Sequence, residues 1–182
     1  DVEGNLKISG GNTNPSNGAV LTSDATGNAV WKNNNIGFTT GQELGQSIPY
    51  NSFANLTFDT ETFDAGNDYN TSSSATDPNS FVAPVSGLYH FSAFAQLQIT
   101  SGVYNITSGN ILLSRNNVGF AAGVANQSID APGYSTAYVQ VDADVRLSAG
   151  TRVTVQAWAN NSGSLATSVS SKRFSGHLVF AD

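Results

Sequence analysis

The sequence contains no cysteine and no methionine, and only 11% of its residues are charged. The absence of cysteine excludes a disulfide framework, thiol catalysis and a cysteine-ligated zinc site. Soluble domains usually carry roughly 25% charged residues, so solubility here depends on asparagine, serine, threonine and glycine. Because the chain starts at Asp1 and has no methionine, we expect it to be a processed or truncated piece of a longer protein.

Positive charge is also scarce, with 7 lysines and arginines against 13 aspartates and glutamates and a net charge of −6. A protein that binds nucleic acid or an anionic membrane surface needs a basic footprint, so neither partner is expected. No stretch approaches the ~20 consecutive apolar residues of a membrane-spanning helix, and we expect no membrane insertion. Hydrophobic residues make up 39% of the chain and aromatic residues 10%, which is enough for a core and argues against disorder.

Helical periodicity is missing too, because no window carries a convincing apolar stripe with a period of 3.6 residues. Instead, apolar and polar residues alternate along residues 88–99, 138–147 and 152–158. A period of two is typical of antiparallel strands with one buried face. Many such short strands, separated by turn residues, predict an all-β sandwich or jelly roll.

Residues 1–49 differ in composition from the rest of the chain. We expect a small hairpin from residues 19–22 and 29–31, with a glycine and an asparagine in its turn, followed by a linker over residues 33–45. This segment is too small to bury a core alone. It resembles modules of bacterial surface and fibre proteins that often precede a trimeric head. We therefore interpret it as a stalk and linker, and residues 50–182 as one domain.

Four segments of the chain carry a second resemblance. They are Phe63–Asn70, Phe81–Ala93, Leu147–Val155 and Phe174–Asp182. In this order they resemble the signatures of C1q-like domains of the C1q/TNF superfamily, over residues 50–182. Each motif alone would be weak, but four in the right order are specific. The resemblance implies a ten-stranded antiparallel jelly roll that assembles as a homotrimer and binds a ligand, whose identity it does not give.

The resemblance also implies which side chains face partner subunits. In the family, the strands that contain His90 and His177 are neighbours in the sheet that faces the trimer axis. Tyr89 and Phe91 fill the interior, so side chains of the opposite parity point to the partners. The predicted trimer-interface residues are Leu88, His90, Phe94, His177 and Val179. The inner face of the last strand is predicted to carry Phe174, Leu178 and Phe180.

Two interpretations of the histidine pair stay open. Three copies of His90 and His177 would bring up to six imidazoles near the axis, where they could respond to pH or hold an ion. Alternatively, both are ordinary polar residues at the interface or its rim.

Strand direction predicts that residues 98–108, 125–134 and 159–172 lie at the end of the domain remote from its C-terminus. Aromatic, amide and carboxylate groups on a rigid scaffold suit recognition of a saccharide or a protein, although exposed loops often have this composition. The predicted ligand-binding residues are Tyr104, Asn105, Asn126, Gln127, Tyr134, Asn160 and Asn161.

Calcium is the one cofactor to which the resemblance points. Some C1q-like trimers bind it at this end, and Asp130 falls where the family can place an acidic ligand. The glutamine expected a few residues later is replaced by Ala137, so half of the pattern is present. Asp130 is therefore either a calcium ligand or a plain turn residue before Pro132.

An enzyme is disfavoured, because the sequence has no G-x-S-x-G elbow, P-loop or G-x-G-x-x-G motif. The leading prediction is a non-catalytic trimeric head of a bacterial or phage-type surface or fibre protein. It would mediate adhesion or receptor binding at the cell surface, outside the cell or at a fibre tip. Two alternatives stay open: a structural trimerisation cap and a soluble signalling ligand of the C1q/TNF kind. Against the second, the N-terminal segment has no collagen repeat, since glycine does not recur every third residue.

Overall fold

The computed structural model describes residues 19–23, 26–32, 35–42, 45–71, 76–100, 103–125, 128–131 and 134–182. At residues 32, 128–131 and 134 it describes the backbone alone. The described residues form strands, turns and loops, and none of them lies in a helix. The chain divides into two compact units, Asp1–Asn35 and Ile36–Asp182.

In the first unit, β1 (Val20–Ser23) and β2 (Ala29–Lys32) form an antiparallel hairpin. The Thr22 hydroxyl donates to the Val30 carbonyl at 3.2 Å across the strands. Gly27 in the turn has φ 87°, a conformation that glycine adopts without steric cost. The predicted hairpin is confirmed, whereas its similarity to fibre stalks stays a prediction.

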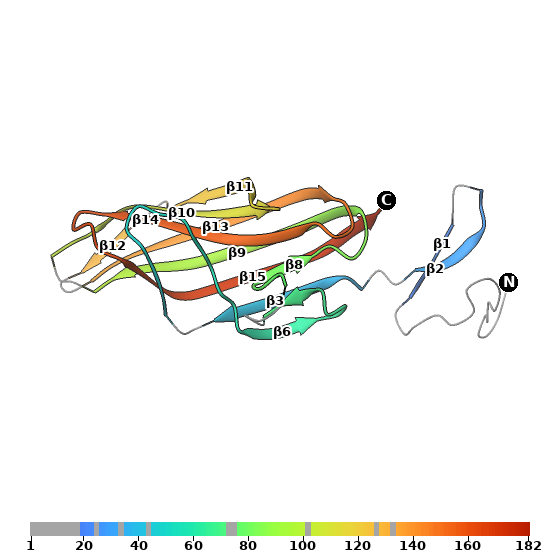
Figure 1. Cartoon of the computed structure of the whole chain (residues 1–182), viewed down its shortest axis with the longest axis horizontal. Coiled ribbons are helices and arrows are strands. Elements are labelled where there is room, and N and C mark those ends of the chain that lie inside the picture. The colour runs from blue at the N-terminus through green and yellow to red at the C-terminus, as the bar shows by residue number, and fades with distance from the viewer. Residues whose placement is uncertain are drawn as a thin grey trace. The chain divides into compact units, whose positions relative to one another are not determined.

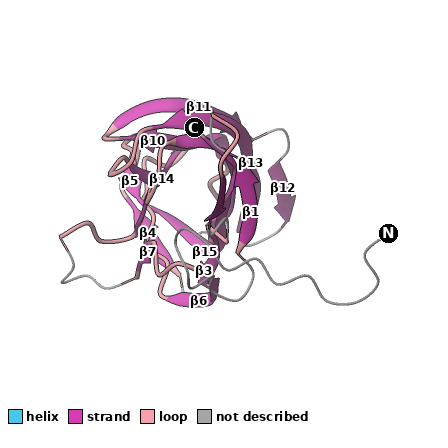
Figure 2. Ribbon diagram, turned by 90° about the vertical axis from the view of Figure 1, so that its right-hand side faces the viewer, coloured by secondary structure: helices cyan, strands magenta, loops and turns pink. Residues whose placement is uncertain are grey.

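The second unit is a sandwich of two antiparallel sheets (Figures 1 and 2). The first has seven strands in the order β12–β13–β9–β15–β3–β6, with β4 also paired to β15. Its strands are β3 (Gly37–Gln42), β4 (Gln46–Ile48), β6 (Thr60–Asp64), β9 (Gly87–Ile99), β12 (Ser128–Ala131), β13 (Tyr134–Leu147) and β15 (Thr167–Ala181). The second has six strands in the order β11–β10–β14–β8–β7, with β5 beside β14. Its strands are β5 (Ala54–Asn55), β7 (Tyr69–Asn70), β8 (Ser80–Val82), β10 (Ile106–Arg115), β11 (Val118–Val124) and β14 (Arg152–Asn161).

The core lies between the two sheets and is rich in aromatic rings. Along β9 every second residue is buried, as the alternation of apolar and polar residues predicts. Phe38 of β3 stacks on Phe81 at 5.1 Å between ring centroids and meets the edge of Phe174 at 4.9 Å. Such pairs contribute about 0.5–1.5 kcal/mol each beyond the burial of their area. The predicted all-β antiparallel sandwich is confirmed, while the count of ten strands stays a prediction.

The compact unit begins earlier than the boundary predicted at residue 50. Residues 33–45, which we expected to form a linker, contain β3, whose Thr40 pairs with Phe174 of β15. Phe38 of β3 is only 2% exposed, so this strand belongs to the core. The Gly-Phe-Thr-Thr-Gly-Gln sequence of β3 offers one large apolar residue. Its burial depends on pairing with β15, which no local pattern reveals.

The two sheets approach each other where β11 lies beside β13. Gly123 of β11 makes this approach possible, because a Cβ at that position would overlap the backbone carbonyl of Gln140 in β13. Glycine is therefore required here by space and not by an unusual φ.

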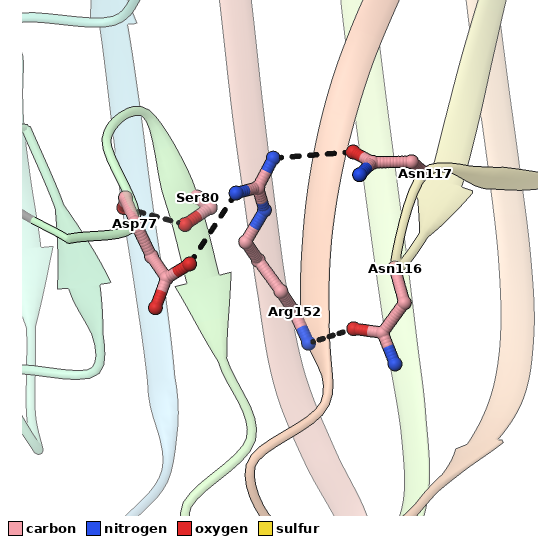
Figure 3. A network of polar contacts seen from close by, with 5 residues as sticks. All are labelled: Asp77, Ser80, Asn116, Asn117 and Arg152. Atoms are coloured by element: carbon pink, nitrogen blue, oxygen red, sulfur yellow. Dashed lines mark hydrogen bonds and ion pairs between the residues drawn. The ribbon is translucent and has the colours of Figure 1, made fainter.

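A polar network around Arg152 ties three segments together (Figure 3). The guanidinium donates to Asp77 Oδ1, before β8, and to Asn117 Oδ1, in the β10–β11 turn, both at 3.3 Å. The backbone N–H of Arg152 donates to Asn116 Oδ1 at 3.0 Å. The hydroxyl of Ser80 adds a bond to the Asp77 carbonyl at 2.7 Å. The network therefore fixes the start of β14 against both neighbouring strands.

Candidate functional site

Several loops meet at the end of the sandwich remote from the C-terminus, here termed the distal end (Figure 1). Strand β9 begins beside the end of β15 and reaches the distal end at Ile99, which pairs with Ser135 of β13. The loop after β9, the start of β13 and the β14–β15 loop therefore share this end, as strand direction predicts. Residues 49–53 join them, since the Asn51 N–H donates to the Ala159 carbonyl at 3.1 Å.

The β14–β15 loop is organised by Asn161, which is only 3% exposed. Its Oδ1 accepts the backbone N–H groups of Gly163 at 3.1 Å and Leu165 at 3.0 Å, and its Nδ2 donates to the Leu165 carbonyl at 2.7 Å. The half-buried Asn160 accepts the backbone N–H of Asn161 at 2.8 Å. The amide of Asn161 is engaged within the chain and holds the loop, while its predicted contact with a ligand stays a prediction.

A second set of hydrogen bonds joins the loop after β9 to the β14–β15 loop. The N–H of Asn105 donates to Ser162 Oγ, and the N–H of Ser162 donates to the Asn105 carbonyl, both at 3.0 Å. The ring of Tyr104 lies over Gly163, where a Cβ would overlap it. Tyr104 is nevertheless 39% exposed, so the structure brings Tyr104 and Asn105 to the same surface as the β14–β15 loop.

Apolar side chains that the sequence analysis did not single out are also exposed at the distal end. They are Tyr50 at 37%, Phe53 at 47%, Val103 at 80% and Leu165 at 38% exposure. Phe53 packs beside Trp158 of β14, with 6.4 Å between ring centroids. These residues lie in segments of turn composition, where no periodic pattern marks a side chain. Exposed rings and methyl groups beside amides form a surface suited to sugars or proteins.

The remaining predicted residues of this end are only partly described. Asn126 and Gln127 lie outside the described residues, and for Asp130 and Tyr134 the structure describes the backbone alone. Asp130 belongs to β12 and pairs with Ser135 of β13. The calcium ligand therefore stays a prediction. Where side chains are described, no group of three histidine, aspartate or glutamate residues could hold a metal ion.

The solvent-facing side of the seven-stranded sheet is a second candidate surface, here termed the β9 face. Its main residues are Tyr138, Gln140, Asp142, Asp144 and Arg146 of β13, Leu88, His90, Ser92 and Phe94 of β9, and Arg173, Ser175, His177 and Phe180 of β15. One row crosses three neighbouring strands through Asp144, His90 and His177. His90 Nδ1 lies 2.7 Å from Asp144 Oδ1, and the two imidazole centroids are 5.4 Å apart. The histidines are thus close together on one face, as predicted.

Two aromatic groups flank this row on the β9 face. Phe94 stacks on Tyr138 with 6.1 Å between ring centroids. The guanidinium carbon of Arg146 lies 5.4 Å from the ring centroid of Phe180, and Arg146 also forms an ion pair with Asp182. Tyr138 and Phe180 remain 44% and 45% exposed. The face therefore combines exposed aromatic area with charges of both signs.

A β-bulge corrects the predicted orientation of Phe180. The alternation predicts Phe180 in the interior, but the pairing of β15 with β9 shifts between Leu178 and Phe180. The extra residue moves Phe180 to the outside, opposite Leu88. Leu178 still packs against the core, while Val179 in the bulge is 50% exposed. The interface role of Val179 and of the other four predicted residues stays a prediction.

The charges of the β9 face influence one another. Hydrogen bonds from Ser92 and then from Gln140 lower the pKa of Asp142 below its ordinary value of 3.8, and nearby His90 acts in the same direction. Beside β3, Arg173 lines an open groove of about 330 Å³ together with threonines of β3 and β6. Hydroxyl, guanidinium and carboxylate groups on one face allow polar contacts to a partner of complementary charge.

Comparisons with known proteins bear on the fold. The sequence matches no protein-family model and no curated protein. The structure is similar to the globular domain of a zebrafish complement 1qA protein, with a TM-score of 0.57 and 16% sequence identity, over 81% of this chain and 99% of that chain. The second compact unit, which is the chain without its first 35 residues, makes up the same share of the sequence. The structure has no helix long and apolar enough to cross a membrane within its described residues. The second unit therefore has the jelly-roll fold of a C1q globular domain, as the sequence motifs indicate.

Proposed function

We propose that the second compact unit is a non-catalytic binding head that assembles as a homotrimer. Its distal end would bind an extracellular glycan or protein receptor. The protein would serve adhesion or receptor recognition at a cell surface or at the tip of a bacterial or phage-type fibre. The C1q-type fold supports this proposal, as does the chemistry of the β9 face and of the distal end.

The observation that carries the trimer is the exposed aromatic area of the β9 face. Tyr138 and Phe180 are large apolar side chains that remain almost half exposed in the single chain. Tyr138 lies beside Phe94 and Phe180 lies opposite Leu88, so apolar side chains are exposed toward both ends of this face, where a partner would cover them. The same face holds both Asp144 and Arg146, so it can complement a rotated copy of itself. Further copies of this chain are therefore the occupants that we infer.

The distal end supports receptor binding because it is rigid and exposed at once. Its loops are tied by the buried Asn161 and by the bonds between Asn105 and Ser162. Tyr104 and Leu165 stay accessible on this framework. A trimer would present three such surfaces in parallel, and three weak sites would then bind a multivalent receptor far more strongly than one.

Assembly is tested by the mass of the protein in solution. We expect about three times the chain mass of 18.9 kDa at micromolar concentration, measured by light scattering. Tyr138→Arg should lower it to the mass of one chain, because it places a third positive charge on the proposed interface. Val118→Arg is the matched control, since Val118 is 67% exposed on β11 of the other sheet. A wild-type mass of one chain would contradict the trimer.

Receptor binding is tested on a broad glycan array and on host-cell surface proteins, in calcium and in chelator. Tyr104→Ala and Leu165→Ala should reduce binding, whereas Val85→Ala, at the opposite end of the sandwich and 37% exposed, should not. Binding that survives both distal substitutions would contradict the assigned surface. A trimer that binds nothing in either condition would favour the structural cap.

A further inference from the structure

We propose that His90 and His177 form a chelating pair for a divalent transition metal of the Zn²⁺ class, and that Asp144 positions His90 in it. Neither the fold nor the trimer requires such a site. The proposal rests on the placement of the only two histidines of the chain beside each other on an exposed face.

The pair has the accessibility that a metal needs. His90 and His177 lie directly opposite each other on β9 and β15, at the centre of the seven-stranded sheet. The His90 side chain is 37% exposed, and His177 is exposed as well. Two neighbouring strands hold the two imidazoles, so their separation is set by the sheet and not by a loop.

The spacing of the rings agrees with shared coordination. Zn²⁺ takes ligands in a tetrahedron with Zn–N distances of about 2.1 Å, which places the centroids of two bound imidazoles about 5 Å apart. The observed separation is 5.4 Å with 42° between the ring planes. The distance between the two rings therefore allows both imidazoles to bind one ion.

Asp144 gives His90 the orientation of a metal ligand. A carboxylate can only accept a hydrogen bond, so the 2.7 Å contact with Asp144 Oδ1 places the hydrogen of His90 on Nδ1. The lone pair of Nε2 is then left for a metal. A carboxylate behind a metal-binding imidazole fixes the tautomer and raises the basicity of the ligand, and removing such a partner costs about 10–100-fold in affinity.

The surrounding charges favour a cation. Asp142 and Asp144 lie on the strand next to His90, and the nearest guanidinium on that strand, Arg146, is already paired with Asp182. One chain supplies two nitrogen ligands, so water or residues of another copy complete the coordination sphere. The chelating pair itself belongs to one chain, so measuring the mass during the same titration separates metal binding from trimer formation.

The experiment is a Zn²⁺ titration of the chain without a polyhistidine tag, followed by calorimetry and by NMR of the imidazole signals. Because the chain has only two histidines, both should respond to the metal and no other imidazole can interfere. His177→Gln and His90→Gln should each weaken binding at least about 100-fold, and Asp144→Asn about 10-fold. Asp142→Asn removes a charge from the same strand without breaking the contact to His90, and should change affinity less than about 3-fold.

Two further measurements separate this proposal from alternatives. In the metal-free chain, ¹⁵N shifts should show His90 protonated on Nδ1, and Asp144→Asn should alter this signature while the fold, seen by circular dichroism, persists. Light scattering with and without Zn²⁺ reports assembly separately: a single chain that binds Zn²⁺ through both imidazoles supports the site and contradicts the trimer. Zn²⁺ binding that is equal in the wild type and His177→Gln, or absent at millimolar Zn²⁺, would overturn the proposal.

Discussion

The outer faces of the two sheets differ in how their polar side chains are satisfied. On the solvent-facing side of the six-stranded sheet, here termed the β14 face, Gln156 bonds to Asn55 at 3.0 Å and to Ser114 at 3.3 Å. Arg152 is held from both sides by its network. Ser114 belongs to the neighbouring strand β10 and Asn55 to the short strand β5, whereas Asp77 and Asn117 lie in segments at the ends of strands. Short flanking segments of the chain therefore satisfy part of this face.

On the β9 face, the described side-chain contacts of β9 itself come from the neighbouring strands β13 and β15. Its side chains pair with one another across neighbouring strands, as in Phe94 with Tyr138 and His90 with Asp144. Much of each pair remains exposed. The two sheets of one sandwich thus differ in the origin of their polar contacts: flanking segments satisfy part of the β14 face, whereas the β9 face depends on pairs between neighbouring strands.

The largest expected effect on stability comes from forcing β11 and β13 apart at the place where the two sheets approach each other. Gly123→Ala would place a methyl group on the backbone carbonyl of Gln140, and a backbone atom cannot move aside as a side chain can. We expect a loss of about 3 kcal/mol in the free energy of unfolding, measured by urea denaturation.

Gly119→Ala in the same strand is the control for Gly123→Ala. Its Cβ would contact only the end of the Leu112 side chain, at 2.9 Å, which can rotate at a cost of about 1 kcal/mol or less. Equal losses in the two variants would show that β11 tolerates no side chain at either glycine, so the closeness of β11 to β13 would not be the cause of the loss at Gly123.

The next prediction compares the stability contributed by two arginines, one on each face. Arg152→Ala removes charged hydrogen bonds from a side chain that is 25% exposed, and we expect a loss of about 1–3 kcal/mol in the single folded chain. Arg146→Ala removes an ion pair and a ring contact from a side chain that is 60% exposed, which should cost less than about 1 kcal/mol. Thermal unfolding of both variants at low protein concentration measures this difference. The reverse order would contradict the distinction between a self-satisfied face and an open one.

Lys172 and Arg173 are successive residues of β15 with opposite environments, because alternate residues of a strand point to opposite sides. Lys172 is fully buried, and this burial lowers the pKa of its ammonium below the ordinary value of 10.5, partly offset by Asp59. Because Asp59 is exposed, its carboxylate stays hydrated when Lys172 is replaced. We therefore expect Lys172→Met to stabilise the fold by about 1 kcal/mol at pH 7.

The lowered pKa of Lys172 also makes the stability of the fold depend on pH. The unfolded chain binds a proton at this lysine more readily than the folded chain, so wild-type stability should rise with pH on approaching 10.5 from below. Lys172→Met should lack that rise, whereas Arg173→Met should keep it and change stability by less than about 0.5 kcal/mol at pH 7. Urea midpoints between pH 7 and 10 provide the measurement. A destabilised Lys172→Met would show that the partners of the lysine outweigh its loss of hydration.

The parts of the fold that could be predicted from sequence are those with a strong local pattern. The alternation in β9 predicts its buried face, and the motif resemblance predicts that the strands of His90 and His177 are neighbours. Strand β3 could not be found in this way, because its single large apolar residue, Phe38, is buried by pairing with β15 and packing on Phe81. The outward turn of Phe180 depends on a bulge, which alternation alone cannot reveal.

The roles of individual side chains at the distal end could not be predicted from sequence either, because they depend on contacts between distant segments. Asn161 lies in a segment whose composition is typical of an exposed loop, yet it is buried because its amide bonds to the backbone of its own turn. The position of Phe53 depends on packing beside the ring of Trp158, which is distant in the sequence. Strand direction alone brings the right loops to one end, whereas the role of each side chain depends on these tertiary contacts.

The smallest expected effect concerns Asp142, at the surface of the β9 face. Because hydrogen bonds from Ser92 and Gln140 lower the pKa of Asp142 below 3.8, the folded chain releases this proton more readily than the unfolded chain. The resulting stability is present above pH 3.8 and is lost as the pH falls through the lower, folded value. Asp142→Asn should therefore lose less stability than the wild type on acidification below pH 4, as measured by urea midpoints.

Ser92→Ala tests the cause of the Asp142 shift without removing the carboxylate. Since Ser92 is the main contributor, its removal should move the NMR titration of the Asp142 carboxyl carbon back toward 3.8 and reproduce part of the acid response of Asp142→Asn. If the titration does not move, the hydrogen bond from Ser92 does not hold the carboxylate in solution, and this position of the β9 face is more mobile than its pairing implies. If it moves, an exposed polar group of the β9 face is pre-arranged in the single chain, as a surface that meets other copies without reorganisation requires.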